Sequence, residues 1–290
     1  MRAIFQWNVG SRVLELGRRT LIMGVVNATP DSFSDGGLYI DAEKAVVRAE
    51  QLLDDGATII DVGGESTRPG ASESVPDEEE RRRVLPVIRD LKRRRPDAVV
   101  SVDTYKATVA RAAVELGAEV VNDVSGFRWD PKMAKTLAEL KVGAVLMHTR
   151  GRPEEWRSLP PIGDPVLLVK RELRQWAEAA TLAGIKRDRL VLDPGFGFGK
   201  RFEENYPLLA HFAELQQVGF PLLAGVSRKS FIGRTLARDG KDAEVAERLY
   251  GTLAAETGLI LKGVHIIRTH DVRFAVEAAR VADAIVANGG

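Results

Sequence analysis

The chain contains no cysteine among its 290 residues. This absence excludes thiol nucleophiles, disulfide bonds and zinc sites with cysteine ligands, and it suits a reducing compartment. Histidine is also scarce. The four histidines show neither the HExxH spacing nor any other paired spacing of zinc ligands. A zinc enzyme is therefore not expected, and we predict a cytoplasmic protein.

An excess of charge of one sign and a long hydrophobic run at the start are absent as well. Lysine and arginine total 42 against 41 aspartates and glutamates, so no nucleic-acid partner and no membrane surface are expected. Residues 1–20 carry charges throughout and resemble neither a secretory signal nor a membrane span. We expect a short β-hairpin at 1–20 that closes the floor of a barrel at 21–290. No linker divides the chain, so 1–290 is expected to be one domain.

What the sequence does contain is one junction repeated eight times, in which a short apolar run ends in polar or ionisable residues. Apolar runs of this kind are typical of parallel strands that are buried on both faces. Segments with helical periodicity lie between them. Strict alternation of eight such units predicts a (β/α)8 TIM barrel of the α/β class, with a doubly wound open sheet as the alternative. The strands are expected near 21–26, 58–62, 98–102, 119–122, 144–147, 190–192, 221–225 and 264–267, and the helices near 41–54, 77–94, 105–116, 131–140, 165–183, 203–217, 243–261 and 272–286.

Glycines follow several of the expected helices. Left-handed glycine at a helix C-terminus turns the chain back toward the next strand. We expect this role for Gly56, Gly117, Gly143, Gly184 and Gly263.

The polar residues of the eight junctions should meet, because strand carboxyl ends share one face of a barrel. The residues expected to converge there are Asn27, Arg68, Asp103, Asn122, Asp193, Lys229, Arg268 and His270. Barrels often hold phosphate after their last two strands, where this chain has Arg268 and His270. Asn27 offers an oxygen suited to Mg²⁺ that shares ligands with phosphate. The alternative is a structural pairing of Arg268 and His270 with Asp271.

Asp103, Asn122 and Asp193 lie directly behind apolar strands, where an unpaired carboxylate is costly. A flat heterocycle with amide-like and amino edges would satisfy these groups, and Lys229 could donate to a ring carbonyl. Met147 and Phe198 offer surfaces for such a ring. The alternative is that Asp103 and Asp193 are helix caps or turn formers and that Met147 is ordinary core.

The glycine-rich run GFGFGK at 195–200 follows a strand but is not a nucleotide-binding motif. It has neither the G-x-G-x-x-G spacing nor the GK[ST] ending of a P-loop. We interpret it as flexible backbone close to a ligand.

Seven segments together resemble dihydropteroate synthase, the folate-pathway family that sulfonamides inhibit. The resemblance implies condensation of 6-hydroxymethyl-7,8-dihydropterin diphosphate with 4-aminobenzoate in a Mg²⁺-dependent reaction, and a homodimer. The matching segments are NATPDSFSDGG (27–37), GGESTRPG (63–70), SVDT (101–104), NDVSG (122–126), DPGFGFGK (193–200), SRKSFIGR (227–234) and RTHDV (268–272).

The resemblance also implies roles for individual residues. Asn27 would bind the metal and, with Arg268 and His270, the diphosphate. The pterin would be bound by Asp103, Asn122, Met147, Asp193, Lys229 and Arg268. Two lid loops and the 4-aminobenzoate pocket would be formed by Phe33, Ser66, Thr67, Arg68, Pro69, Phe198 and Ser230. The catalytic set would be Asp35, Lys229, Arg268 and His270, with Asp35 stabilising a cationic pterin.

The sequence departs from the family pattern after the fifth strand of the expected barrel. Thr149 replaces a methionine, and Arg150 and Arg152 add positive charge. Two alternatives therefore stay open. A methyltransferase that binds methyl-tetrahydrofolate would have no use for Lys229 or the diphosphate pair, and a silent pterin-binding paralogue should have lost Asn27 or Asp35.

Overall fold

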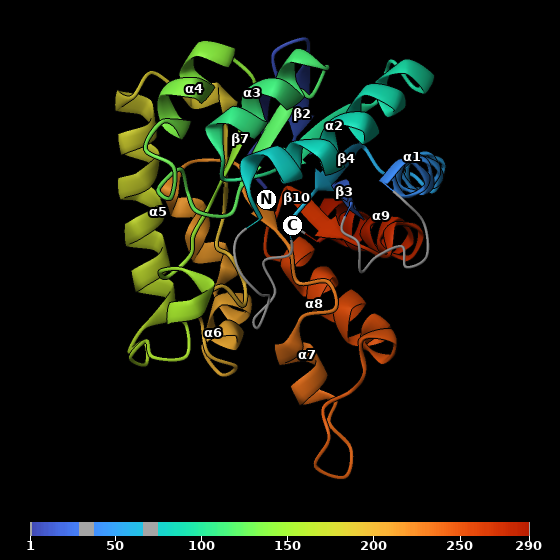
Figure 1. Cartoon of the computed structure of the whole chain (residues 1–290). Coiled ribbons are helices and arrows are strands. Elements are labelled where there is room, and N and C mark those ends of the chain that lie inside the picture. The colour runs from blue at the N-terminus through green and yellow to red at the C-terminus, as the bar shows by residue number, and fades with distance from the viewer. Residues whose placement is uncertain (1, 29–37, 66–74, 290) are drawn as a thin grey trace.

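The computed structural model describes residues 2–28, 38–65 and 75–289 (Figure 1). Eight parallel strands form one sheet in the order β8-β7-β6-β5-β4-β3-β10-β9. An isolated parallel bridge between Leu192 and Leu222 joins the two outer strands and closes the sheet into a barrel. The strands are β3 Leu21–Asn27, β4 Ile59–Gly63, β5 Val99–Asp103, β6 Val120–Asp123, β7 Gly143–Met147, β8 Leu190–Asp193, β9 Leu223–Ala224 and β10 Ile266–Thr269. The predicted TIM barrel is confirmed, and the open-sheet alternative is excluded.

Helices surround the strands, with α5 on one side of the barrel and α1 and α9 on the other (Figure 1). No helix of the described ranges is long and apolar enough to cross a membrane. The helices are α1 Leu38–Asp54, α2 Asp77–Arg94, α3 Ala107–Glu115, α4 Met133–Leu140, α5 Pro165–Leu182, α6 Asn205–Ala210, α7 Ser230–Thr235, α8 Leu249–Leu261 and α9 Val272–Asn288.

Two of the predicted helices differ in the structure. The segment expected as one helix at 203–217 consists of α6 and a 3-10 helix at Phe212–Val218, because the backbone leaves helical geometry at His211. The segment 243–261 begins as a 3-10 helix at Val245–Arg248 before α8. The short helix α7 was not predicted, since six residues carry too little periodicity to detect.

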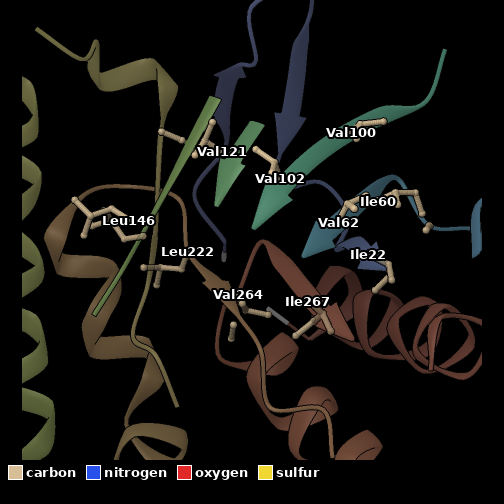
Figure 2. Packing of buried hydrophobic residues seen from close by; sticks show 14 of the residues in the cluster. Ile22, Ile60, Val62, Val100, Val102, Val121, Leu146, Leu222, Val264 and Ile267 are labelled. Atoms are coloured by element: carbon tan, nitrogen blue, oxygen red, sulfur yellow. The ribbon is translucent and has the colours of Figure 1, made fainter. Parts of the chain in front are cut away.

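Alternating side chains give the barrel two hydrophobic layers. Outward-facing residues of the strands pack against the helices, and Figure 2 shows part of this layer, including Ile22, Val100 and Ile267. Inward-facing residues form a separate cluster at the floor, to which Met23, Ile59 and other strand residues contribute. Strands buried on both faces explain the continuous apolar runs in the sequence.

The N-terminal hairpin closes this floor as predicted. Strands β1 Phe5–Asn8 and β2 Val13–Leu16 pair antiparallel. Trp7 is buried in the floor cluster with Leu16, and its indole Nε1–H donates to the carbonyl of Arg189 at 2.9 Å.

One predicted glycine role is wrong and depends on this hairpin. Gly143 is the first residue of β7, and the left-handed residue after α4 is Lys141, with φ of 57°. A Cβ at position 143 would lie 2.9 Å from Val9 and 3.1 Å from the Trp7 ring. Glycine is therefore required there by the close approach of the hairpin. The other four glycines do have positive φ, as predicted.

Candidate active site

A polar layer lies directly above the apolar floor inside the barrel. Successive residues of a strand point to opposite faces, so the residue two positions after each floor residue also points inward. Five strands place polar side chains in this layer: Asp61 after Ile59, Ser101 after Val99, Asn122 after Val120, Asp193 after Val191, and Arg268 after Ile266. Asn122, Asp193 and Arg268 were predicted to converge, and the alternation explains why they do.

Arg268 is the centre of this layer. Its Nε donates to Asp61 Oδ2 and its Nη2 donates to Asp103 Oδ2, both at 2.7 Å. Burial alone would lower the pKa of Arg268, but the two carboxylates raise it above its ordinary value. The pKa of Asp103 is raised by burial, against the effect of Arg268. Arg268 is thus a fixed cation between two carboxylates.

The predicted alternative for Arg268 is wrong. Asp271 accepts hydrogen bonds from Nε of Arg228, at 2.9 Å, and from its Nη2. Arg228 therefore neutralises Asp271, and Arg268 is directed into the barrel.

Asp61 is a further residue of this layer that the sequence did not predict. Its side chain is fully buried and accepts from Asn122 Nδ2 at 3.0 Å as well as from Arg268. Its other oxygen, Oδ1, has no hydrogen-bond partner in the described structure. The signal that could have revealed it is its position, which is equivalent to that of Asn122 in the strand alternation.

Asp193 and Lys229 form a second charged group of the layer. Asp193 Oδ1 accepts from the amide of Gly195 at 2.7 Å, so the turn-former role is present in addition to any ligand role. Lys229 Nζ donates to the carbonyl of Phe196 and lies 4.6 Å from the centroid of the Phe198 ring. Burial lowers the pKa of Lys229 to about 8, an effect that Asp193 opposes and Arg268 reinforces. Burial raises the pKa of Asp193, against the attraction of Lys229.

His270 lies beside Ser227 at the end of β10. Ser227 Oγ is 3.0 Å from His270 Nδ1 and accepts from the His270 amide at 3.2 Å. Ser230, the first residue of α7, is exposed and follows Lys229 directly. The predicted diphosphate residues Arg268 and His270 therefore stand on one strand end, beside the Ser227 to Ser230 segment.

Met147 belongs to a small cluster of apolar and aromatic side chains at the strand ends. It is buried with Tyr105 and Val124, and Trp129 and Phe198 pack against them. The rings of Tyr105 and Trp129 meet edge to face at 4.9 Å. Met147 faces inward because it lies two residues after Val145 of the floor cluster. It pairs with Asp193 across β7 and β8.

The two arginines that depart from the family pattern make contacts at the rim of the barrel, and Arg150 binds the loop that follows β8. Arg150 Nη1 donates to the carbonyl of Gly199 at 3.1 Å, and its Nη2 donates to that of Pro160 at 2.9 Å. The guanidinium of Arg152 lies over the Trp129 ring at 5.0 Å. Thr149 is buried. These substitutions form structural contacts of the rim and leave the inner polar layer intact.

Asn27 ends β3 opposite Gly63 of β4. Its carboxamide oxygen is a ligand type that Mg²⁺ accepts. Within the described residues, no group of three or more histidine, cysteine, aspartate or glutamate side chains could hold a metal ion. The single oxygen of Asn27 fits a metal ion that takes one protein ligand and shares its other positions with substrate phosphates and water, as Mg²⁺ commonly does.

The remaining predicted residues lie outside the described residues. These are Phe33, Asp35, Ser66, Thr67, Arg68 and Pro69.

Comparison with known proteins gives consistent results. The family model described as pterin binding enzyme matches residues 23–270. A dihydropteroate synthase of Synechocystis is 42% identical over 277 residues, which covers 96% of this chain and 94% of the relative.

Solved structures agree with the sequence relatives. A Xanthomonas albilineans dihydropteroate synthase with 4-aminobenzoic acid has a TM-score of 0.89 at 42% identity, covering 98% of this chain and 99% of that one. The same enzyme in complex with 7,8-dihydropteroate has a TM-score of 0.85 at 40% identity, covering 97% and 99%.

Proposed function

The chain belongs to the dihydropteroate synthase family, and from this premise we propose how its own residues share the work of the family reaction. Its activity is that of a dihydropteroate synthase, a transferase of the pterin-methylene group. It condenses 6-hydroxymethyl-7,8-dihydropterin diphosphate with 4-aminobenzoate to give 7,8-dihydropteroate and pyrophosphate. The observation that carries the assignment of roles is the inner polar layer around Arg268.

The polar layer suits the edge of a pterin. Carboxylates accept from the ring N–H and amino groups, Asn122 can donate and accept, and Lys229 donates to the ring carbonyl. Asp103 and Asp193 supply the carboxylates, and Met147 lines the pocket beside the ring. Arg268 would lie over the ring, held there by Asp61 and Asp103.

The diphosphate would be bound at the end of β10. Arg268 and His270 would donate to its oxygens, and Asn27 would hold Mg²⁺ together with the diphosphate. When bound, Mg²⁺ supplies charge neutralisation for the leaving group. The proximity of Ser227 to the His270 ring supports a fixed orientation for this donor.

The 4-aminobenzoate would bind beside Phe198 and Ser230. The lid residues Phe33, Ser66, Thr67, Arg68 and Pro69 would close this pocket and exclude water. The positions of Phe198 against Lys229 and of Ser230 next to it support a pocket that adjoins the pterin.

We infer that the diphosphate departs before the amine attacks. The carbon–oxygen bond to the diphosphate breaks and leaves a methylene cation that the dihydropterin ring stabilises. Asp35 would stabilise this cation, and Arg268 and His270 would bind the charge that develops on the leaving oxygen. The neutral amine then forms the new carbon–nitrogen bond and loses a proton to solvent.

The alternative functions are less consistent with the chain. The comparisons favour the synthase over a methyltransferase that binds methyl-tetrahydrofolate. A silent paralogue would not need the intact pairing of Arg268 with both Asp61 and Asp103.

We further propose that residues 1–290 act as one cytoplasmic domain that forms a homodimer through α8 and α9. These two helices pack against each other (Figure 1). They carry exposed apolar side chains, among them Tyr250 at 82% and Val281 at 64% exposure. Exposed apolar patches of this kind are typical of protein interfaces.

The assignment of roles is tested by comparing Asp193→Asn with Asn27→Ala. We expect Asp193→Asn to raise the KM for the pterin diphosphate and leave the Mg²⁺ requirement unchanged. Asn27→Ala should raise the Mg²⁺ concentration needed for half-maximal turnover. Equal effects of both variants on both quantities would contradict this division of roles.

A further inference from the structure

The turn that follows β8 is held against the end of β7. Its three glycines, Gly195, Gly197 and Gly199, have φ values of 65°, 80° and 65°. A Cβ at position 195 would lie 1.9 Å from the carbonyl oxygen of His148. Side chains are therefore excluded from this contact, and the backbone of the turn lies directly on the backbone after β7.

This close contact brings several carbonyl groups together, and Lys200 binds them. Lys200 Nζ donates to the carbonyl oxygens of Gly195 at 2.7 Å, Phe198 at 3.2 Å and His148 at 3.4 Å. The side chain is buried, and among the described residues it forms no ion pair with a carboxylate. An ammonium group has three N–H donors, which matches three carbonyl acceptors.

The same turn presents the groups that face Lys229. The carbonyl of Phe196 accepts from Lys229 Nζ, and the Phe198 ring lies under it. The Gly195 amide donates to Asp193 Oδ1. Lys200 therefore binds the carbonyls of Gly195 and Phe198, and the Gly195 amide contacts Asp193 while the Phe196 carbonyl and the Phe198 ring contact Lys229.

We propose that Lys200 is a positioning residue for the pterin-binding pair Asp193 and Lys229. Its ammonium group holds the 195–198 turn in the conformation that aims Lys229 and orders Asp193. We accordingly expect a turn that is held in one conformation, where the glycine content of the motif predicted flexible backbone. This inference deepens the proposed function and rests on it.

The electrostatics make this role depend on pH. The pKa of Lys200 is lowered to about 7, by burial first and by Lys229 second and against the attraction of Asp193, so Lys200 holds the turn as an ammonium group below about pH 7. In return, the positive charge of Lys200 favours the ionised form of Asp193. Lys200 thus acts on the pair through the backbone and through charge.

The test compares Lys200→Met, which removes all three donors, with Lys200→Gln, which keeps two. Hydrogen exchange of the 195–199 amides and calorimetric binding of 6-hydroxymethylpterin and of Mg²⁺-pyrophosphate would be measured. We expect Lys200→Met to accelerate exchange of the turn and to weaken pterin binding about tenfold or more, with pyrophosphate binding nearly unchanged. Lys200→Gln should restore part of the pterin affinity, and it also serves if the methionine variant does not fold.

The matched control is Lys92→Met. Lys92 likewise donates to two carbonyls, those of Pro96 and Ala98, at 2.9 Å each, and it also pairs with Glu119 at 3.5 Å, but at the opposite end of the barrel. This control should leave pterin affinity and exchange of the turn unchanged. Wild-type pterin affinity in Lys200→Met would overturn the inference alone, whereas failure of the wild-type protein to bind the pterin would overturn the proposed function.

Discussion

At the scale of single residues, Arg268 is a cation that two carboxylates share, the buried Asp61 and the partly buried Asp103. Arg268 is bound by Asp61 and Asp103, and Asp61 also binds Asn122. A buried charge is costly unless it is paired and hydrogen-bonded, so removal of one partner affects the others. We therefore expect Asp61 to support the proposed pterin pocket through Arg268 and Asn122.

Replacement of Asp61 by asparagine tests this dependence. The substitution keeps the volume of the side chain but removes the charge that fixes Arg268 from one side. We expect the free energy of unfolding to fall by about 1–3 kcal/mol, because Asp103 still pairs with Arg268. Pterin affinity should fall by about tenfold or more. Urea unfolding and calorimetry measure both, and Asp90→Asn at an exposed ion pair is the control.

The pH dependence of pterin binding tests the role of Lys229. Its pKa is lowered to about 8, and only the ammonium form carries the positive charge that attracts the ring carbonyl. The contribution of Lys229 to affinity should therefore be constant below about pH 8 and fall by about tenfold per pH unit above it, whereas loss of the Lys200 charge should begin near pH 7. Asp103 and Lys200 also have shifted pKa values, so a variant must separate the contributions. Lys229→Met should bind weakly and lose this fall, and an unchanged alkaline limb in that variant would contradict the assignment.

At the scale of elements, much of the site could be predicted because strand alternation places residues without knowledge of tertiary contacts. Asn122, Asp193 and Arg268 end apolar runs, and their convergence follows from the barrel alone. Asp61 was missed because it lies inside the apolar run of β4, two residues before its end. The roles of Lys200 and Gly143 depend on contacts between elements distant in sequence, which no local pattern reveals.

The N-terminal hairpin is an element whose effect on stability should be separable from function. Trp7 is buried in the barrel floor, whereas Val13 on the same hairpin is 54% exposed. Trp7→Ala should lower the free energy of unfolding by about 3–5 kcal/mol. Pterin affinity should stay the same, because Trp7 packs at the start of the strands, against Gly143, and the floor cluster separates it from the polar layer. Urea unfolding of Trp7→Ala beside Val13→Ala checks this, and a similar cost for both would show that the hairpin does not seal the floor.

At the scale of the whole molecule, closure of the barrel brings the first and last strands to one site. β3 pairs with β10, so Asn27 and Arg268 belong to neighbouring strands although they lie far apart in the sequence. The diphosphate site proposed here requires both strands. The active site is therefore a property of the closed barrel.

The homodimer is also a prediction at this scale. Glutamate at Tyr250 and Val281 together should convert a dimer into a monomer, because two charges would be buried at the interface. Leu182→Glu is the control, since Leu182 is 90% exposed on α5, away from α8 and α9. Light scattering after gel filtration gives the mass directly. A monomeric wild-type protein, or a dimer that survives the double substitution, would contradict the proposed interface.

The most direct test of the central claim is the stoichiometry of the reaction. Pyrophosphate release and 7,8-dihydropteroate formation would be measured together with 6-hydroxymethyl-7,8-dihydropterin diphosphate and Mg²⁺, with and without 4-aminobenzoate. The account predicts equal amounts of both products when 4-aminobenzoate is present, and loss of both in Lys229→Ala. Pterin binding without any dihydropteroate formation by the wild-type protein would contradict it.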